Sequence, residues 1–236
     1  NKCKTITFSR LMTNINFNYT LNDIQIERVS QIKDLGVILD HHLSFIPHIQ
    51  YICGHAIKML GFIFRNTSSF TNVDALLTLY FAYVRSKLEY ASVVWDPYYS
   101  IHIMAIERIQ RRFCKYLYYV KYYTYPPRSF PNKMLLNDFN LLSLKERRTF
   151  ANIYFFFKLI HGYTVSKNLL SQINFHVPRL NCRYSGTFMI NCSRTNQHYF
   201  SPLNNMCRCY NDVAPIVDIF VTSSIKSFRV LLYRSD

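Results

Sequence analysis

The stretch His102 to Lys121, HIMAIERIQRRFCKYLYYVK, predicts an amphipathic helix with two chemically different faces. At roughly 100° per residue, the apolar side chains gather on one flank: Ile103, Ile106, Ile109, Phe113, Leu117 and Val120. The cations gather on the opposite flank: Arg108, Arg111, Arg112 and Lys115. Such a helix is either a core helix with a solvated outer face or a cationic ridge suited to a polyphosphate backbone.

The charge of the whole chain favours the second interpretation. The 236 residues include 28 Lys and Arg against 13 Asp and Glu, which gives a formal net charge of +15 at pH 7. An excess of this size sets an electrostatic field over the entire surface. Nucleic acid is therefore the first partner to consider.

The composition is that of a globular chain of one or two domains, since 50% of the residues are hydrophobic and 17% are aromatic. Only five glycines are present, and neither GxGxxG nor a Walker pattern occurs, which excludes nucleotide binding by those routes. The longest apolar run, Ile153 to Ile160, contains Lys158 and is far shorter than the roughly 20 residues of a membrane-spanning helix. We therefore expect no membrane partner.

The seven cysteines are odd in number and mostly far apart, and the sequence shows no secretory leader. This pattern predicts reduced thiols in an intracellular protein of the nucleus or cytoplasm. The chain opens on Asn1, and the residues that follow read like the middle of a fold. We expect it to be a fragment of a longer protein.

Residues 1–45 have strand character. An Asn22-Asp23 turn is expected to join Phe17–Leu21 to Ile24–Val29 in a hairpin. Gly36, inside the apolar run Leu35–Leu39, predicts a bulge or a close backbone approach. This segment is expected to form the edge of a sheet with a hairpin.

From Pro47 onward the hydrophobic period becomes helical. The first helix is expected to bury Ile49, Ile52, Cys53, Ala56, Ile57, Leu60 and Phe64. Capping boxes at Thr71 and Ser143 predict the starts of two more helices, the later one ending at Gly162. We predict an α+β fold, with a sheet edge and hairpin over 1–45, a helical bundle over 46–125 and a mixed helical extension over 126–236.

No catalytic or metal centre of the chain's own is expected. The acidic residues are scattered, and Asp34 and Asp40 suit turn capping better than a two-metal centre. Neither a Gly-x-Ser-x-Gly elbow nor a recognisable Cys-His-Asn arrangement occurs. His48 and His55, one helical repeat apart, are expected along a solvated seam. A zinc site is not favoured because paired spacing is lacking among the candidates Cys182, Cys192, His198, Cys207 and Cys209.

Aromatic residues interleave with the cations at the end of the cationic helix. The mixture comprises Arg111, Arg112, Phe113, Lys115, Tyr116, Tyr118, Tyr119, Lys121, Tyr122 and Tyr123. Cations bind phosphates and flat rings stack on unpaired bases, so this mixture suits a single strand or the end of a duplex. The alternative is that the rings pack with their hydroxyls at the rim, and the sequence leaves both open.

Four ordered groups of segments resemble the reverse transcriptases of non-LTR (LINE-like, jockey-type) retrotransposons of animals. The segments are NKCKTITFSR (1–10), KDLGVILD (33–40) with LSF (43–45) and HI (48–49), VRSKLEYASVVWDP (84–97) with IERIQRRF (106–113), and YND (210–212) with SFR (227–229). They span nearly the whole chain. The resemblance implies the end of a palm domain over 1–45, a thumb domain and a C-terminal extension.

The chain departs from that family at the catalytic centre. The family uses an aspartate on an earlier palm strand and an Ala-Asp-Asp turn, and neither occurs here. The resemblance therefore implies that Mg²⁺ belongs to the full-length polymerase and that this piece holds no cofactor. It also implies that Lys2 corresponds to a palm lysine that assists departure of pyrophosphate as a general acid. The Lys33–Asp40 hairpin corresponds to the grip on the primer end, and the upstream endonuclease domain is missing.

The two lines of reasoning meet on one helix, which falls in the thumb of the resembled family. We therefore expect Arg108, Arg111, Arg112 and Lys115 to contact phosphates of an RNA–DNA template-primer without reading bases. The missing palm and fingers of the same polyprotein are the other expected partner. Two alternatives remain: an inactive retroelement remnant, or a host protein-interaction module without a polymerase role.

Overall fold

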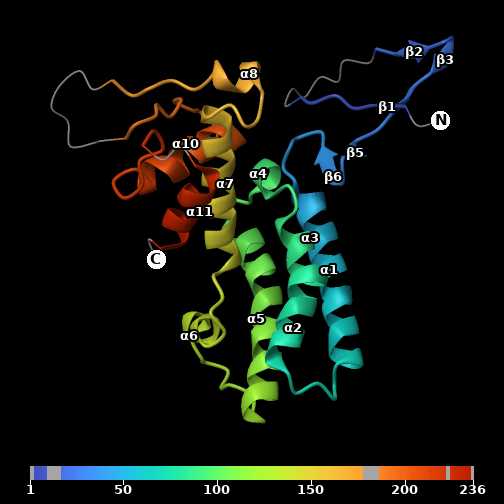
Figure 1. The fold of residues 1–236 in the computed structure, drawn as a ribbon. Helices are drawn as coiled ribbons and strands as arrows, with labels where there is room; N and C mark the ends of the chain where they lie inside the picture. The colour runs from blue at the N-terminus through green and yellow to red at the C-terminus, as the bar shows by residue number, and fades with distance from the viewer. Residues whose placement is uncertain (1–2, 10–16, 178–185, 222–223, 235–236) are drawn as a thin grey trace. The chain divides into compact units, whose positions relative to one another are not determined.

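The computed structural model describes residues 3–9, 17–177, 186–221 and 224–234 (Figure 1). The chain divides into two compact units, one of residues 1–90 with 99–129 and one of residues 91–98 with 130–236. Helices dominate both units, and short strands occur in the first. The predicted α+β, mainly helical class is confirmed.

The strands of the first unit pair in small two-stranded sheets. They are β1 (Lys4–Thr5), β2 (Thr20–Leu21), β3 (Ile24–Gln25), β4 (Glu27–Arg28), β5 (Gln31–Asp34) and β6 (Val37–Asp40). β1 and β4 pair in parallel, whereas β2 with β3 and β5 with β6 form antiparallel hairpins. The predicted turn at Asn22 and Asp23 is confirmed, with positive φ angles of 49° and 60° that match a tight hairpin.

The predicted strand Leu35–Leu39 is wrong at its start. Leu35 and Gly36 form the turn of the β5–β6 hairpin, with φ angles of 44° and 87°. The close neighbour of Gly36 is a side chain and not the predicted backbone, because a Cβ atom there would lie 3.2 Å from Cε1 of Tyr90. Glycine therefore meets both a backbone and a packing requirement at this turn.

The helical part of the first unit consists of rods packed side by side (Figure 1). The helices are α1 (Ile46–Asn66), α2 (Val73–Tyr80), the π-helical turn η1 (Phe81–Arg85), α3 (Ser86–Glu89) and α5 (Ser100–Tyr122). α2, η1 and α3 follow one another without a break, and both α1 and α2 contact α5. Between α2 and α5, the rings of Tyr80 and Phe113 stack at 4.1 Å with an interplanar angle of 8°.

Two details of the predicted helices need correction. α2 is capped by Asn72 and not by Thr71, because the Asn72 side chain accepts hydrogen bonds from the backbone N–H groups of Asp74 and Ala75 at 2.9 and 3.2 Å. Ile57, predicted to be buried, is 46% exposed, since it lies at the edge of the apolar arc of α1.

The second unit is built around the long helix α7. Its helices are α4 (Ser92–Trp95), α6 (Asn132–Asn137), α7 (Leu144–Ile160), α8 (Lys167–Leu170), α9 (Asn196–Tyr199), α10 (Pro202–Val213) and α11 (Ile225–Arg234). The predicted capping box of Ser143 with Glu146 is confirmed, and Gly162 follows the end of α7 with a φ of 72°. The core gathers aromatic rings of Phe156, Phe157, Phe188, Tyr210 and Phe228.

A buried polar contact ties the Trp95-Asp96-Pro97 stretch into the second unit. The Asp96 carboxylate accepts hydrogen bonds from Nε of Arg148 at 2.9 Å and from Nδ2 of Asn152 at 2.9 Å. Asn205 on α10 donates to the same carboxylate at 3.2 Å. Since Arg148 is 1% exposed, this ion pair compensates a guanidinium group that would otherwise be buried without a counter-charge.

Among the described residues, no helix combines the length and the apolarity that crossing a membrane requires.

Asp40 caps the turn that leads from the β5–β6 hairpin into α1, which confirms the turn-capping role predicted for it. Its carboxylate accepts hydrogen bonds from the Phe45 N–H at 2.9 Å, the Ser44 N–H at 3.1 Å and the Ser44 hydroxyl at 2.9 Å. Burial raises the pKa of Asp40, but these hydrogen bonds outweigh it, so the pKa lies below its ordinary value of 3.8. The stabilisation is therefore present above pH 3.8 and is lost as the pH falls through the lowered pKa.

We predict that Asp40→Ala lowers the free energy of unfolding at pH 7 by about 2 kcal/mol, because two backbone donors lose their acceptor. Urea denaturation of the full chain, followed by circular dichroism, measures the change. The matched control Asp34→Ala removes an exposed carboxylate of the same hairpin and should cost less than about 0.5 kcal/mol. Equal effects of the two variants would contradict the capping role, as would a difference that persists at a pH well below the Asp40 pKa.

Candidate nucleic-acid interface

The helix predicted from the sequence is α5, and one of its faces is buried as expected. Ile106, Ile109, Phe113 and Leu117 are each at most 3% exposed. The predicted apolar residues Ile103 and Val120 are half-buried at the margins of this face. Gln110 and Cys114 complete the buried face, so it is wider than the apolar pattern alone indicates.

The opposite flank of α5 carries the four predicted cations. Arg108 and Arg112 are exposed, whereas Arg111 and Lys115 are half-buried. In the described part of the chain, no acidic side chain forms an ion pair with Arg108 or Arg112. The Arg112 guanidinium lies 5.9 Å from the ring centre of Phe64, so this group stands beside α1. The structure thus brings these cations together on one helix, and we call their surface the cationic flank.

Some tyrosines in the second half of α5 are packed against α1, and others are exposed to solvent. The Tyr116 hydroxyl donates to the Thr67 carbonyl at 2.9 Å, and its ring packs 4.4 Å from that of Phe64, so Tyr116 joins α5 to the end of α1. In contrast, Tyr122 and Tyr123 are 43% and 74% exposed. The packing interpretation is confirmed for Tyr116, whereas base stacking by the exposed rings stays a prediction.

Tyr119 and Tyr125 form an exposed aromatic pair just beyond the cations. Their rings stack at 4.7 Å with an interplanar angle of 15°, and they are 40% and 65% exposed. α5 ends at Tyr123, which adopts a left-handed backbone conformation with a φ of 58°. The end of α5 therefore presents flat rings to solvent next to the positive charge.

The other predicted binding residues are on different elements. Lys33 lies on β5, where its ammonium group donates to the Tyr51 hydroxyl at 3.3 Å and stands 4.7 Å from the centre of that ring. It is exposed, and it belongs to the hairpin and not to the cationic flank. Lys2 lies outside the described residues.

The predicted solvated seam of histidines is wrong for His48. This residue is 1% exposed, and its Nδ1 atom accepts a hydrogen bond from the Ile38 N–H at 3.3 Å. It therefore fastens the β5–β6 hairpin to α1. The sequence could not show this, because the partner is a backbone group on a different element.

The remaining candidates are the possible metal ligands and the cysteine thiols. Within residues 3–9, 17–177, 186–221 and 224–234, no three His, Cys, Asp or Glu side chains are grouped to hold a metal ion. Burial raises the pKa of the Cys114 thiol to about 12 and that of Cys209 to about 12, so both stay protonated and poorly nucleophilic at pH 7. Cys182 of the zinc candidates lies outside the described residues.

Sequence reasoning missed a second group of basic and aromatic side chains, which surrounds Lys33. Tyr51 and His55 on α1, with Lys87 on α3 and Tyr90 just after it, line a cavity beside the hairpin. The signal in the sequence was weak, because these residues come from segments that are far apart.

Comparison of the chain with protein-family models, with curated proteins and with experimentally determined structures finds no match.

We predict that the double variant Arg108→Glu/Arg112→Glu folds as stably as the natural chain. Both side chains are exposed, so reversing them should change the free energy of unfolding by no more than about 0.5 kcal/mol each. Urea denaturation checks this value. Ile109→Asp is the contrasting variant, because it places a carboxylate inside the buried face and should cost about 3 kcal/mol or more. A comparable loss in the double variant would show that the cationic flank is not on the surface.

Proposed function

We propose that this chain is the C-terminal part of a non-LTR retrotransposon reverse transcriptase, in which α5 holds the RNA–DNA template-primer. The observation that carries the proposal is the cationic flank, fixed on the outside of α5 by a fully buried opposite face. The ordered sequence segments support the family, and the geometry of α5 supports the proposed mode of binding.

The spacing of the cations fits a nucleic-acid backbone. Arg108 and Lys115 are seven residues apart, so they are separated by about 10 Å along the helix axis. One strand of a duplex carries about three phosphates over that length. Flexible Arg and Lys side chains on a rigid helix can therefore meet successive phosphates of one strand.

This arrangement supports binding that ignores sequence. Phosphates are the same at every position of a duplex, and a polymerase has to accept every template. The exposed rings of Tyr119, Tyr122 and Tyr123 next to the cations add surfaces on which unpaired bases can stack. The proposed ligand is thus a hybrid duplex with a single-stranded template overhang.

The chain's contribution under this proposal is binding and not nucleotide transfer. Its sequence contains no adjacent aspartates, so the two-metal chemistry with Mg²⁺ is assigned to the palm and fingers of the same polyprotein. Lys33 in the primer-grip-like hairpin and Lys2 at the start of the chain are proposed to assist at the primer end. The protein would act in the nucleus or cytoplasm, where such templates are found.

We predict that Arg108→Glu/Arg112→Glu weakens binding of a labelled RNA–DNA hybrid by about tenfold or more at 0.1 M salt. The slope of log K against log salt should become less steep by about two units, because two phosphate contacts are lost. Fluorescence anisotropy across a salt series measures both quantities. Two hybrids of unrelated sequence should bind the natural chain equally.

The matched control is Lys167→Glu/Lys226→Glu, which reverses two exposed lysines of the second unit. Each pair of reversals lowers the net charge from +15 to +11, so the two variants differ in where the charge is lost and not in how much. The proposal requires the control to bind nearly as well as the natural chain. Equal losses would indicate non-specific attraction, and no binding by the natural chain would favour a remnant or a host interaction module.

A further inference from the structure

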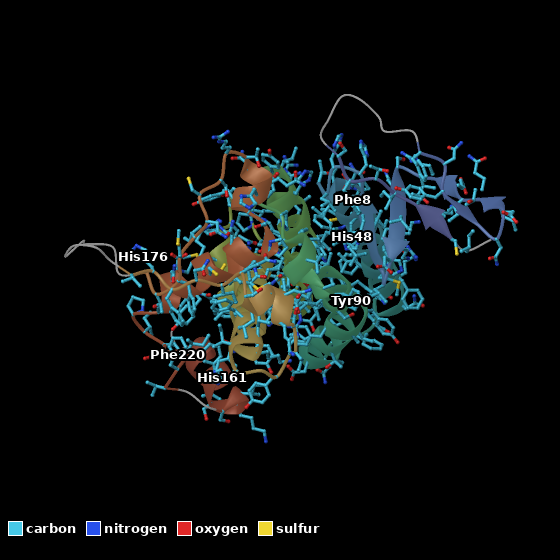
Figure 2. All side chains as sticks on the ribbon, turned by 90° about the horizontal axis from the view of Figure 1, so that it is seen from above. Phe8, His48, Tyr90, His161, His176 and Phe220 are labelled. Carbon is cyan, nitrogen blue, oxygen red and sulfur yellow. The ribbon has the colours of Figure 1, made fainter. Side chains whose placement is uncertain are left out.

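A cavity of about 380 Å³ opens in the first unit beside the β5–β6 hairpin. Its size falls within the range of small-molecule sites. His48 and Tyr90 line it, and their side chains are labelled in Figure 2. Lys33, Tyr51, His55 and Lys87 also line it, so the hairpin, α1 and the end of the α2–α3 rod all contribute.

The lining of the cavity is positively charged. Lys33 and Lys87 supply two positive charges, and none of the described lining residues is acidic. Burial lowers the pKa of His48, and the positive charge of Lys33 lowers it further. Two lysine charges without an acidic lining residue therefore favour a negatively charged ligand.

Two tyrosine rings in the cavity wall are held in place without a ligand. The Tyr90 hydroxyl donates to the Leu35 carbonyl at 2.9 Å, and the Tyr51 hydroxyl accepts from Lys33 at 3.3 Å. The two side chains are nevertheless 57% and 46% exposed. Fixed rings with exposed area are preorganised to contact a flat apolar group.

His55 supplies a polar atom that lacks a partner. Its Nδ1 atom is buried, and it has no hydrogen bond among the residues that the structure describes. Most buried polar atoms in proteins are hydrogen-bonded, so an orphaned nitrogen on a cavity-lining residue suggests a ligand group that completes it.

We propose that this cavity binds a phosphate monoester joined to an aromatic ring, which is the chemistry of a nucleoside monophosphate, free or at the 5′-phosphorylated end of a strand. Lys33 and Lys87 neutralise the phosphate, and Tyr51 or Tyr90 contacts the ring. A polar group of the ligand bonds to His55. The site lies apart from the cationic flank of α5, so loss of hybrid binding at that flank would leave this proposal standing, although the site shares Lys33 with the proposed primer grip.

The test uses the full chain with ¹⁵N-labelled histidine, titrated with adenosine 5′-monophosphate, adenosine and ribose 5-phosphate. The monophosphate should bind about tenfold or more tightly than adenosine, which lacks the phosphate, and than ribose 5-phosphate, which lacks the ring. The imidazole signals of His48 and His55 should shift, whereas those of His161 and His198 in the second unit should not. Equal binding of the three compounds, or shifts of all four histidines, would overturn the proposal.

Paired variants separate the cavity from the general positive charge. Lys33→Met/Lys87→Met should weaken binding of the monophosphate about fivefold or more, because both phosphate contacts are lost. The control Lys58→Met/Arg65→Met removes two exposed cations of α1 that do not line the cavity, and it should change binding less than about twofold. Equal losses in the two variants would contradict the site.

Two further arms identify the source of the ligand. A 5′-phosphorylated trinucleotide and its unphosphorylated form are titrated in the same way. If the phosphorylated trinucleotide binds more tightly than its unphosphorylated form, and as tightly as the free monophosphate, the ligand is a strand end. If only the free monophosphate binds, the ligand is a small molecule. Both outcomes support the site. Arg108→Glu/Arg112→Glu should retain monophosphate binding, and its loss there would count against a separate site.

Discussion

The buried seam between α2 and α5 is the constraint on which the first unit depends. Tyr80 and Phe113 stack at its centre, and Leu76, Val84 and Ile106 around them are fully buried. Each such side chain contributes about 2 kcal/mol through burial. Turning α5 by half a revolution would expose this surface and bury the cations of the opposite flank without partners, which costs several kcal/mol per charge. The outward direction of the cationic flank is therefore a consequence of the core.

Contacts with the helices also fix the position of the hairpin that borders the cavity. Asp40 caps the turn before α1, His48 accepts from the hairpin backbone, and Tyr90 donates to the hairpin turn. Gly36 allows the Tyr90 ring to lie against the turn. The strands are too short to be stable alone, so these contacts with the helices define their position. The same contacts therefore define both the wall of the cavity and the start of α1.

The features predicted from the sequence are those that local patterns control. The two faces of α5, the Asn22-Asp23 turn and the Ser143 cap each depend on residues within a few positions of one another. α10 was not predicted, although Met206, Cys207 and Tyr210 recur at helical spacing on its buried face. The predicted cations of α5 do share one flank, as periodicity requires. The cavity around Lys33 could not be predicted, since its lining residues, from Lys33 to Tyr90, meet through tertiary packing of segments that are far apart in the sequence.

Photocrosslinking tests the central claim most directly, because it reports which surface of the chain touches the nucleic acid. The full chain is irradiated with an RNA–DNA hybrid that carries a photoreactive group on the backbone, and mass spectrometry locates the attached peptides. Our account predicts attachment within α5, at the residues of the cationic flank and the exposed tyrosines that follow it. Attachment spread over the basic residues of both units, or absent from α5, would contradict it.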